Sequence, residues 1–278
     1  MKKSYRKIFI HIFIILLGIV MIYPLLWMLS SSFKFSQDIF TSKTFFPRVV
    51  TLENYIKGWQ GMSGYTFGIF LLNSVFVSLM CILGNFFCCT MAAYAFAKLD
   101  FTFKKVYFAI MLGTLMLPFH VTLIPQYILF NKLHWIDTYL PFIVPKFLGG
   151  QGFFIFLLVQ YMRTIPRELD DAAKIDGCGK IGIFIKLMLP LSLPAIISMA
   201  ILTFLWTWND FFSQLLYLNS IPKFTISIAL RMFIDATSGS QWGSMFAMSI
   251  VSIIPLFLIF VFLQRYIVEG ITAGAIKG

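Results

Sequence analysis

Six apolar stretches, each of about 20 residues or more, recur along the chain and limit what it can fold into. A helix of about 20 apolar residues crosses the roughly 30 Å hydrocarbon layer of a membrane. Because no water reaches that layer, a spanning segment must satisfy its own backbone hydrogen bonds, which leaves helices and closed barrels. Runs of this length favour helices. We therefore predict an all-α membrane protein with six transmembrane helices, at residues 8–30, 67–97, 106–130, 139–162, 190–217 and 243–264.

The composition agrees with a membrane protein and excludes other classes. Hydrophobic residues make up 59% of the chain and charged residues 12%, whereas about 25% of a soluble domain is charged. The formal charge of +11 raises the question of nucleic acid. The basic residues, however, lie in short loops beside apolar spans, where membrane topology and anionic lipid account for them. We predict no nucleic-acid partner and no soluble catalytic domain.

The first apolar stretch follows a basic N-terminus and superficially resembles a secretory signal. Its apolar core is too long for a signal, and it continues with bulky residues at 22–27. We therefore predict an uncleaved first transmembrane helix. Placing the N-terminus in the cytoplasm puts 14 Lys and Arg residues inside and eight outside, as the positive-inside rule favours. The expected location is the cell membrane, with both termini cytoplasmic.

The expected organisation has three parts. Residues 1–66 hold the first transmembrane helix and an irregular outer loop, residues 67–265 form the core transmembrane domain, and residues 266–278 form a cytoplasmic tail. The core includes a polar loop at 163–189. No internal repeat is visible, which argues against transporter folds built from two inverted halves.

The polar loop is the one charged segment in an otherwise apolar region. Pro166 suits a helix start, acidic residues after it complement the positive end of a helix, and Gly177 can adopt the left-handed turn that ends one. The pattern predicts a short helix, a turn and a second helix. Ala172 and Ala173 would let a partner surface approach closely, with Ile175 as an apolar contact. An amphipathic helix held by acidic lipid would have the same composition.

The spacing within this loop resembles the coupling loop of importers of the ATP-binding-cassette superfamily. The sequence has Asp171-Ala172-Ala173, then Gly177, nine residues, and Leu187-Met188-Leu189-Pro190. The family pattern is EAA, glycine, nine residues and I-x-L-P, so Asp171 replaces a glutamate and Leu187 an isoleucine. The resemblance implies a type I importer permease whose cytoplasmic coupling helix contacts an ATPase. The residues implied in this coupling are Asp171, Ala172, Ala173, Asp176, Gly177, Leu187 and Pro190.

Further segments resemble the smaller permease of maltose-type carbohydrate importers. They are Asn73-Ser74, residues 92–97, 137–139 and 208–210, and the tail 270–278. The resemblance implies a heterodimer with a second homologous permease, two ATPase subunits that hold ATP and Mg, an extracytoplasmic solute-binding protein and a carbohydrate substrate. This chain would bind no cofactor. The tail residues implied in contact with the ATPase, along an extended path, are Gly274, Lys277 and Gly278.

A candidate sugar path lies near the end of the fifth span. From Pro190 to Asn209 is about 28 Å of helix, nearly the apolar thickness, so Asn209 and Asp210 fall near the outer face. Amide and carboxylate groups there can hold sugar hydroxyls, with Gln214 and Asn73 as further candidates. Interfacial anchoring and bridging between helices are the structural alternatives for these side chains.

Other activities lack their motifs. The sequence contains no GxxxxGK[ST] phosphate loop, so the chain is not itself the ATPase. No Cys or His spacing matches a metal site. We therefore predict a subunit without catalytic activity. Two alternatives stay open: a permease of an ABC importer for another solute, and an ion-coupled secondary carrier, which needs charged or unwound sites at mid-membrane.

Overall fold

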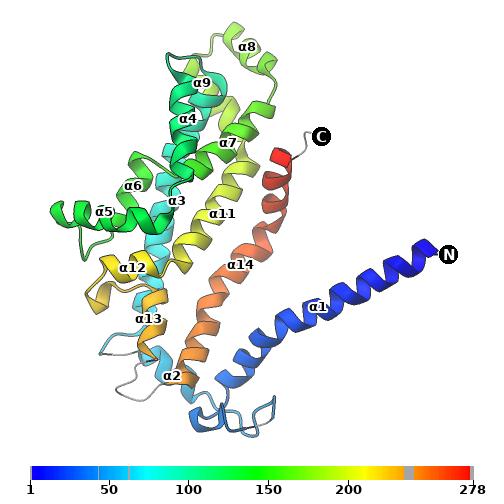
Figure 1. Ribbon diagram of the computed structural model, residues 1–278, viewed down its shortest axis with the longest axis vertical. Coiled ribbons are helices and arrows are strands. Elements are labelled where there is room, and N and C mark those ends of the chain that lie inside the picture. Colours follow the sequence, from blue (N-terminus) through cyan, green and yellow to red (C-terminus); the bar gives the residue numbers. More distant parts are fainter. Residues whose placement is uncertain (1, 43, 62, 235–240, 276–278) are drawn as a thin grey trace. The chain divides into compact units, whose positions relative to one another are not determined.

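The computed structural model describes residues 2–42, 44–61, 63–234 and 241–275, and the side chains of residues 6–265 within these ranges. Over the described residues the chain forms helices and no strand, as predicted (Figure 1). The helices group into two compact units, Met1–Ile69 with Ala229–Ile254, and Phe70–Ile228 with Pro255–Gly278. The first half of the chain holds α1 (Lys2–Ser32), α2 (Glu53–Gln60), α3 (Phe67–Lys98), α4 (Lys104–Leu115), α5 (Phe119–Lys132) and α6 (Leu140–Leu148). The second half holds α7 (Gly152–Thr164), α8 (Arg167–Ile175), α9 (Lys180–Ile183), α10 (Leu189–Leu191), α11 (Leu193–Asn209), α12 (Phe212–Tyr217), α13 (Ile226–Met232) and α14 (Trp242–Ala275).

Four helical segments are long and apolar enough to cross a membrane: Arg6–Ser32, Phe67–Lys98, Leu140–Thr164 and Trp242–Arg265. They match the predicted first, second, fourth and sixth spans. The other two predicted spans are bent pairs of helices. The pair Lys104–Leu115 and Phe119–Lys132 bends by 101°, and Lys180–Leu191 with Leu193–Asn209 bends by 74°. The described residues therefore contain six spans if each bent pair is one.

The bends correct two predicted spans, and local chemistry explains both. Pro118 has an extended backbone and precedes α5, so the third span is broken there. The fifth span was predicted to continue to residue 217, but α11 ends at Asn209. Asp210 is extended, and its carboxylate accepts a hydrogen bond from the Ser213 N–H at 3.1 Å, which caps the separate helix α12.

In the first unit, the segment that was predicted as an irregular outer loop contains a helix, α2. Asn54 on α2 is 4% exposed and donates to the carbonyls of Ser32 at 2.9 Å and Lys34 at 2.6 Å. Gly243 on α14 lies against it, since a Cβ there would stand 2.2 Å from the Asn54 Oδ1. These contacts hold the end of α1, α2 and the start of α14 together. The apolar side chains of α1 between Ile8 and Leu26 are mostly exposed, as contact with lipid requires.

The second unit has its core around α3. Apolar side chains from α3, α7, α11 and the turn before α10 are buried together, in an inner core of Cys89, Ala93, Phe154, Leu158, Val159, Met162, Met188, Ala195 and Met199. A second apolar cluster joins α3 to α5, α6, α12 and α13 through Val77, Cys81, Phe130, Phe142, Tyr217, Leu218 and Ile228. The α3 helix therefore contributes to both clusters of this unit.

A buried amide lies in the middle of α3. Asn85 is fully buried, and its Nδ2 donates to Thr203 Oγ1 on α11 at 3.0 Å and to Gln151 Oε1, just before α7, at 3.2 Å. Interhelical hydrogen bonds of this kind fix helix pairs inside a membrane. Asn85 therefore bridges α3 to α11 and to the residue before α7.

Candidate functional site

The predicted helix, turn and second helix are present in the polar loop. Helix α8 begins directly after Pro166, whose backbone is extended, and carries Glu168 and Asp170 in its first turn. Gly177 has φ +81°, the left-handed conformation that only glycine adopts without strain. The N–H of Cys178 reaches back to the carbonyl of Ala173 at 2.9 Å, which closes the end of α8.

The outer face of α8 carries the residues with an implied coupling role. Asp171, Ala172, Asp176 and Gly177 are exposed, and Ile175 is 88% exposed. Ile175 is thus a large apolar side chain open to a partner on a polar helix, and Ala172, with only a methyl group, lies one turn before it. Ala173 is the exception: it is half-buried and packs against the inner core. Ala172 and Ala173 thus have different surroundings, which the residue type alone could not reveal.

An exposed ion pair joins Asp171 to Lys174 at 2.7 Å, with side chains 67% and 62% exposed. The hydrogen bond from Lys174 and then its charge hold the pKa of Asp171 below its ordinary value. Such an exposed pair contributes little to stability. Its effect is to keep both charges on the outward surface of α8.

The inner face of α8 carries a second ion pair that sequence reasoning missed. Asp170 is 7% exposed, and its Oδ2 lies 3.0 Å from the Nζ of Lys98 at the end of α3. The sequence assigned Asp170 only a favourable position at a helix N-terminus. The sequence shows Lys98 at the end of one apolar span and Asp170 in a later loop, but nothing in their spacing indicates that they form a pair.

Leu187 and Pro190 lie on the return limb, which leads from α9 into α11. Between α9 and α10, residues Phe184–Met188 form a π-helical turn in which the Leu189 N–H bonds to the Phe184 carbonyl. Pro190 is exposed and has no N–H to offer the preceding turn, which favours this irregular pattern. Leu187 is half-buried against the inner core. The limb then bends by 74° into α11.

The four residues predicted for a sugar path are largely used by the chain itself. Gln214 is 2% exposed, donates to the Thr207 carbonyl at 3.0 Å and accepts a hydrogen bond from Thr225. Asp210 caps α12. Asn73 donates to two loop carbonyls, and Asn209 donates to the Leu205 carbonyl at 2.8 Å. Only Asn209 of these four is exposed.

The predicted tail contacts fall at the edge of the described chain. Lys277 and Gly278 lie outside the described residues. Gly274 lies within α14, which continues to Ala275, so this part of the tail is helical and not extended. The predicted contact with an ATPase stays a prediction.

Metal binding has no support among the described residues, where no group of three or more His, Cys, Asp or Glu side chains converges. The four cysteines are free thiols.

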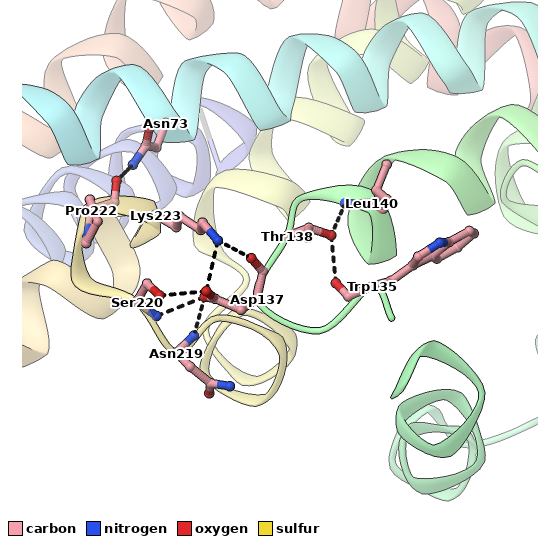
Figure 2. Close-up of polar contacts among 9 residues, drawn as sticks. All are labelled: Asn73, Trp135, Asp137, Thr138, Leu140, Asn219, Ser220, Pro222 and Lys223. Atoms are coloured by element: carbon pink, nitrogen blue, oxygen red, sulfur yellow. Dashed lines mark hydrogen bonds and ion pairs between the residues drawn. The ribbon is translucent and has the colours of Figure 1, made fainter. Parts of the chain in front are cut away.

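A second polar cluster, here named the Asp137 clamp, joins the loop before α6 to the loop between α12 and α13 (Figure 2). Asp137 has φ +59°. Its carboxylate accepts the N–H groups of Asn219 at 2.9 Å and Ser220 at 2.8 Å, the Ser220 hydroxyl at 2.6 Å and the Lys223 ammonium at 2.9 Å. Asn73 on α3 holds the same loop by donating to the carbonyls of Pro222 at 2.8 Å and Phe224 at 2.9 Å.

The Asp137 clamp should make stability fall at acid pH. Burial raises the pKa of Asp137, but the hydrogen bonds from Lys223, Ser220 and Asn219 outweigh it and hold the pKa well below its ordinary value. A depressed pKa means that the stabilisation is complete above the unfolded value of about 4 and is lost as the pH falls below it. Asp137→Asn should lower stability at pH 7 by about 2 kcal/mol and flatten this acid loss.

The measurement is the thermal unfolding midpoint in detergent at pH 7 and pH 3.5. Asp100→Asn is the control, because Asp100 has an 84% exposed side chain and should leave the profile unchanged. Equal pH dependence in the natural protein and Asp137→Asn would contradict the clamp's role.

Residues 84–273 match the family model described as binding-protein-dependent transport system inner membrane component. The chain is 35% identical to the arabinooligosaccharides transport system permease protein AraQ of Halalkalibacterium halodurans, over 94% of this chain and 93% of that protein. It is 31% identical to the trehalose/maltose transport system permease protein MalG of Thermococcus litoralis, over 100% and 99%.

A solved structure shares the fold. A chain in the crystal structure of a bacterial ABC transporter involved in the import of the acidic polysaccharide alginate aligns with TM-score 0.86 and 19% identity, covering 96% of this chain and 98% of that one. The resemblance to an importer permease that the polar loop suggested is thus confirmed, and the chain is an integral membrane protein that belongs to the family of binding-protein-dependent transport system inner membrane components.

Proposed function

We propose that the chain is the transmembrane permease subunit of an ATP-driven importer that moves a sugar or oligosaccharide delivered by an extracytoplasmic binding protein. The observation that carries this proposal is α8, a helix with a polar and a buried face, set between two apolar spans. Its outward surface presents Ala172 and the 88% exposed Ile175 to a partner. A monomeric carrier has no use for such a surface.

The carbohydrate class rests on the relatives. The relatives AraQ and MalG are named as transport system permeases for arabinooligosaccharides and for trehalose/maltose. Both align over nearly the full length of this chain, so the similarity is not confined to the coupling loop that importers of other solutes also have. The candidate path residue that is exposed, Asn209, is a neutral amide, which suits hydrogen bonds to the hydroxyls of a neutral sugar.

The proposed assembly contains a second homologous permease, two ATPase subunits and the binding protein. ATP and Mg would be held by the ATPases, and this chain would carry no cofactor and no catalytic site. The exposed apolar faces of α1 and α14 are available for lipid and for the second permease. We place α8 and both termini in the cytoplasm, in keeping with the distribution of basic residues.

Reconstitution into proteoliposomes tests the proposal. The chain would be co-purified with its partner permease and ATPases and supplied with the binding protein and radiolabelled maltotriose or arabinotriose. We expect uptake of at least one of them that requires both ATP and the binding protein. Uptake by this chain alone, driven by a proton or sodium gradient and indifferent to ATP, would instead establish the ion-coupled carrier.

A further inference from the structure

The end of α3 contacts the polar loop at two points. Lys98, the last residue of α3, places its ammonium 3.0 Å from the Asp170 carboxylate on α8 and 2.8 Å from the carbonyl of Ile165, which directly follows α7. One turn earlier, Tyr94 donates its hydroxyl to the carbonyl of Lys180, the first residue of α9, at 3.0 Å. Residues four apart lie on the same face of a helix. One face of α3 therefore holds both limbs of the loop, and α8 and α9 lie at the same end of α3 in Figure 1.

The contact between Lys98 and Asp170 is buried. Their side chains are 4% and 10% exposed, against 62% and 67% for the pair of Lys174 with Asp171 on the same helix. Water and salt screen the outer pair, which contributes little, whereas the inner pair is screened far less. The same short helix thus has one solvent-screened ion pair on its outer face and one buried ion pair on its inner face.

The Asp170 carboxylate depends on Lys98. Its second oxygen, Oδ1, is buried and has no hydrogen-bond partner among the described residues. The Lys98 ammonium is therefore the cation in direct contact with this carboxylate. Removing one member of a buried ion pair leaves an uncompensated charge, which is strongly destabilising, while replacing both members with apolar residues is often neutral.

We propose that Lys98 and Asp170 fix the coupling helix to α3, so that force applied to α8 by the ATPase moves α3 as well as the return limb into α11. Lys98 is then a positioning residue for transport. The proposal rests on the proposed function, because it assigns a path to force that only an ATPase supplies. A hydrogen-bonded ion pair sets distance and direction, which an apolar contact does not.

The test measures uptake in the reconstituted importer, normalised to the amount of this chain that co-purifies with the ATPase. Lys98→Met and Asp170→Asn each remove one charge, Lys98→Arg keeps it, and Lys98→Met/Asp170→Leu removes both. The matched control is Asp100→Asn, which breaks an exposed ion pair, 3.4 Å long, two residues after Lys98. The chemical probes are maltotriose and arabinotriose, with ATP hydrolysis recorded in parallel.

We expect both single variants to lose about tenfold or more of uptake per assembled complex, with Lys98→Arg and Asp100→Asn near the natural level. The double variant separates positioning from charge burial. It should recover the yield of assembled complex, while uptake per ATP hydrolysed stays as low as in the single variants.

Two results would overturn the inference while the proposed function stands. One is unchanged uptake per complex in both single variants. The other is full recovery of uptake in the double variant, which would leave the pair a purely structural role. If the natural protein itself shows no ATP-driven uptake, the proposed function fails and this inference falls with it.

Discussion

Replacing Ala172 with tryptophan should abolish ATP-driven uptake while the protein remains inserted in the membrane. Ala172 is exposed on the outer face of α8, next to the turn that ends at Gly177. Interfaces pack as densely as protein interiors, so an indole at this position would keep a partner surface from closing on the helix. We expect uptake to fall about a hundredfold or more, to the background of vesicles without ATP, because a separated interface transmits no force.

The conservative variants Ala172→Gly and Ala172→Ser are the controls, since both keep the side chain small. They should support uptake within about twofold of the natural protein. Insertion is checked by the amount of full-length chain in the membrane fraction. Near-normal uptake by Ala172→Trp would refute the assignment of α8 as the coupling helix.

The turn after α8 gives a graded form of the same experiment. Gly177 has φ +81°, and no other atom lies within 4 Å of where a Cβ would stand. Gly177→Ala therefore meets no neighbour and costs only the conformational penalty of about 1–2 kcal/mol. Gly177→Pro is incompatible, because proline fixes φ near −65°. Uptake should be reduced by the first variant and abolished by the second, and an equal effect of both would argue against a role for the turn's geometry.

Replacing Gly84 with alanine should destabilise the fold, although alanine is the better helix former. Gly84 on α3 faces α6, where an added Cβ would stand 2.8 Å from the Cβ of Lys146, 2.8 Å from Phe147 Cδ2 and 3.0 Å from the Lys146 carbonyl carbon. The backbone atom among these cannot move without shifting α6. Overpacking of this kind costs about 1–3 kcal/mol.

The matched control is Gly113→Ala on α4, where no atom lies within 4 Å of the added Cβ. Relief of the poor helix propensity of glycine should stabilise this variant by up to about 1 kcal/mol. The measurement is the thermal unfolding midpoint in detergent. The two substitutions should shift it in opposite directions, and a rise with both would show that the approach of α3 to α6 is not tight.

The regular part of the fold follows from the sequence, because the hydropathy and the length of each apolar segment determine it. Four predicted spans match apolar helical segments within a few residues, and the fourth of the six spans consists of α6 and α7. The break of the third span at Pro118 could not be predicted from hydropathy, because the residues on both sides of it are apolar. The early end of the fifth span depends on the hydrogen bond from the Ser213 N–H to the Asp210 carboxylate. Such breaks depend on one or two hydrogen bonds, which a window of about 20 residues averages away. The same holds for α2, whose position depends on the buried contacts of Asn54.

The candidate site divides in the same way. The turn at Gly177 and the outward side of α8 were predictable, since local residue types determine them. The partners of Asp170 and Asp137 were not, because Lys98 and Lys223 lie 72 and 86 residues away in the chain and nothing local pairs them. Gln214 and Asn73 show the converse: both were predicted as candidates for the sugar path, and both donate to backbone carbonyls, Gln214 to Thr207 on α11 and Asn73 to Pro222. Their contact with substrate stays a prediction.

Site-specific photo-cross-linking tests the central claim, that α8 transmits the work of an ATPase to this membrane protein. The photoreactive residue p-benzoylphenylalanine would replace Ile175, whose side chain is 88% exposed on α8, and in a control the 75% exposed Phe46. After irradiation of cells that express the whole importer, we predict a covalent product with the ATPase from position 175 and none from position 46. A product from position 46, or no ATPase product from position 175, would contradict the account.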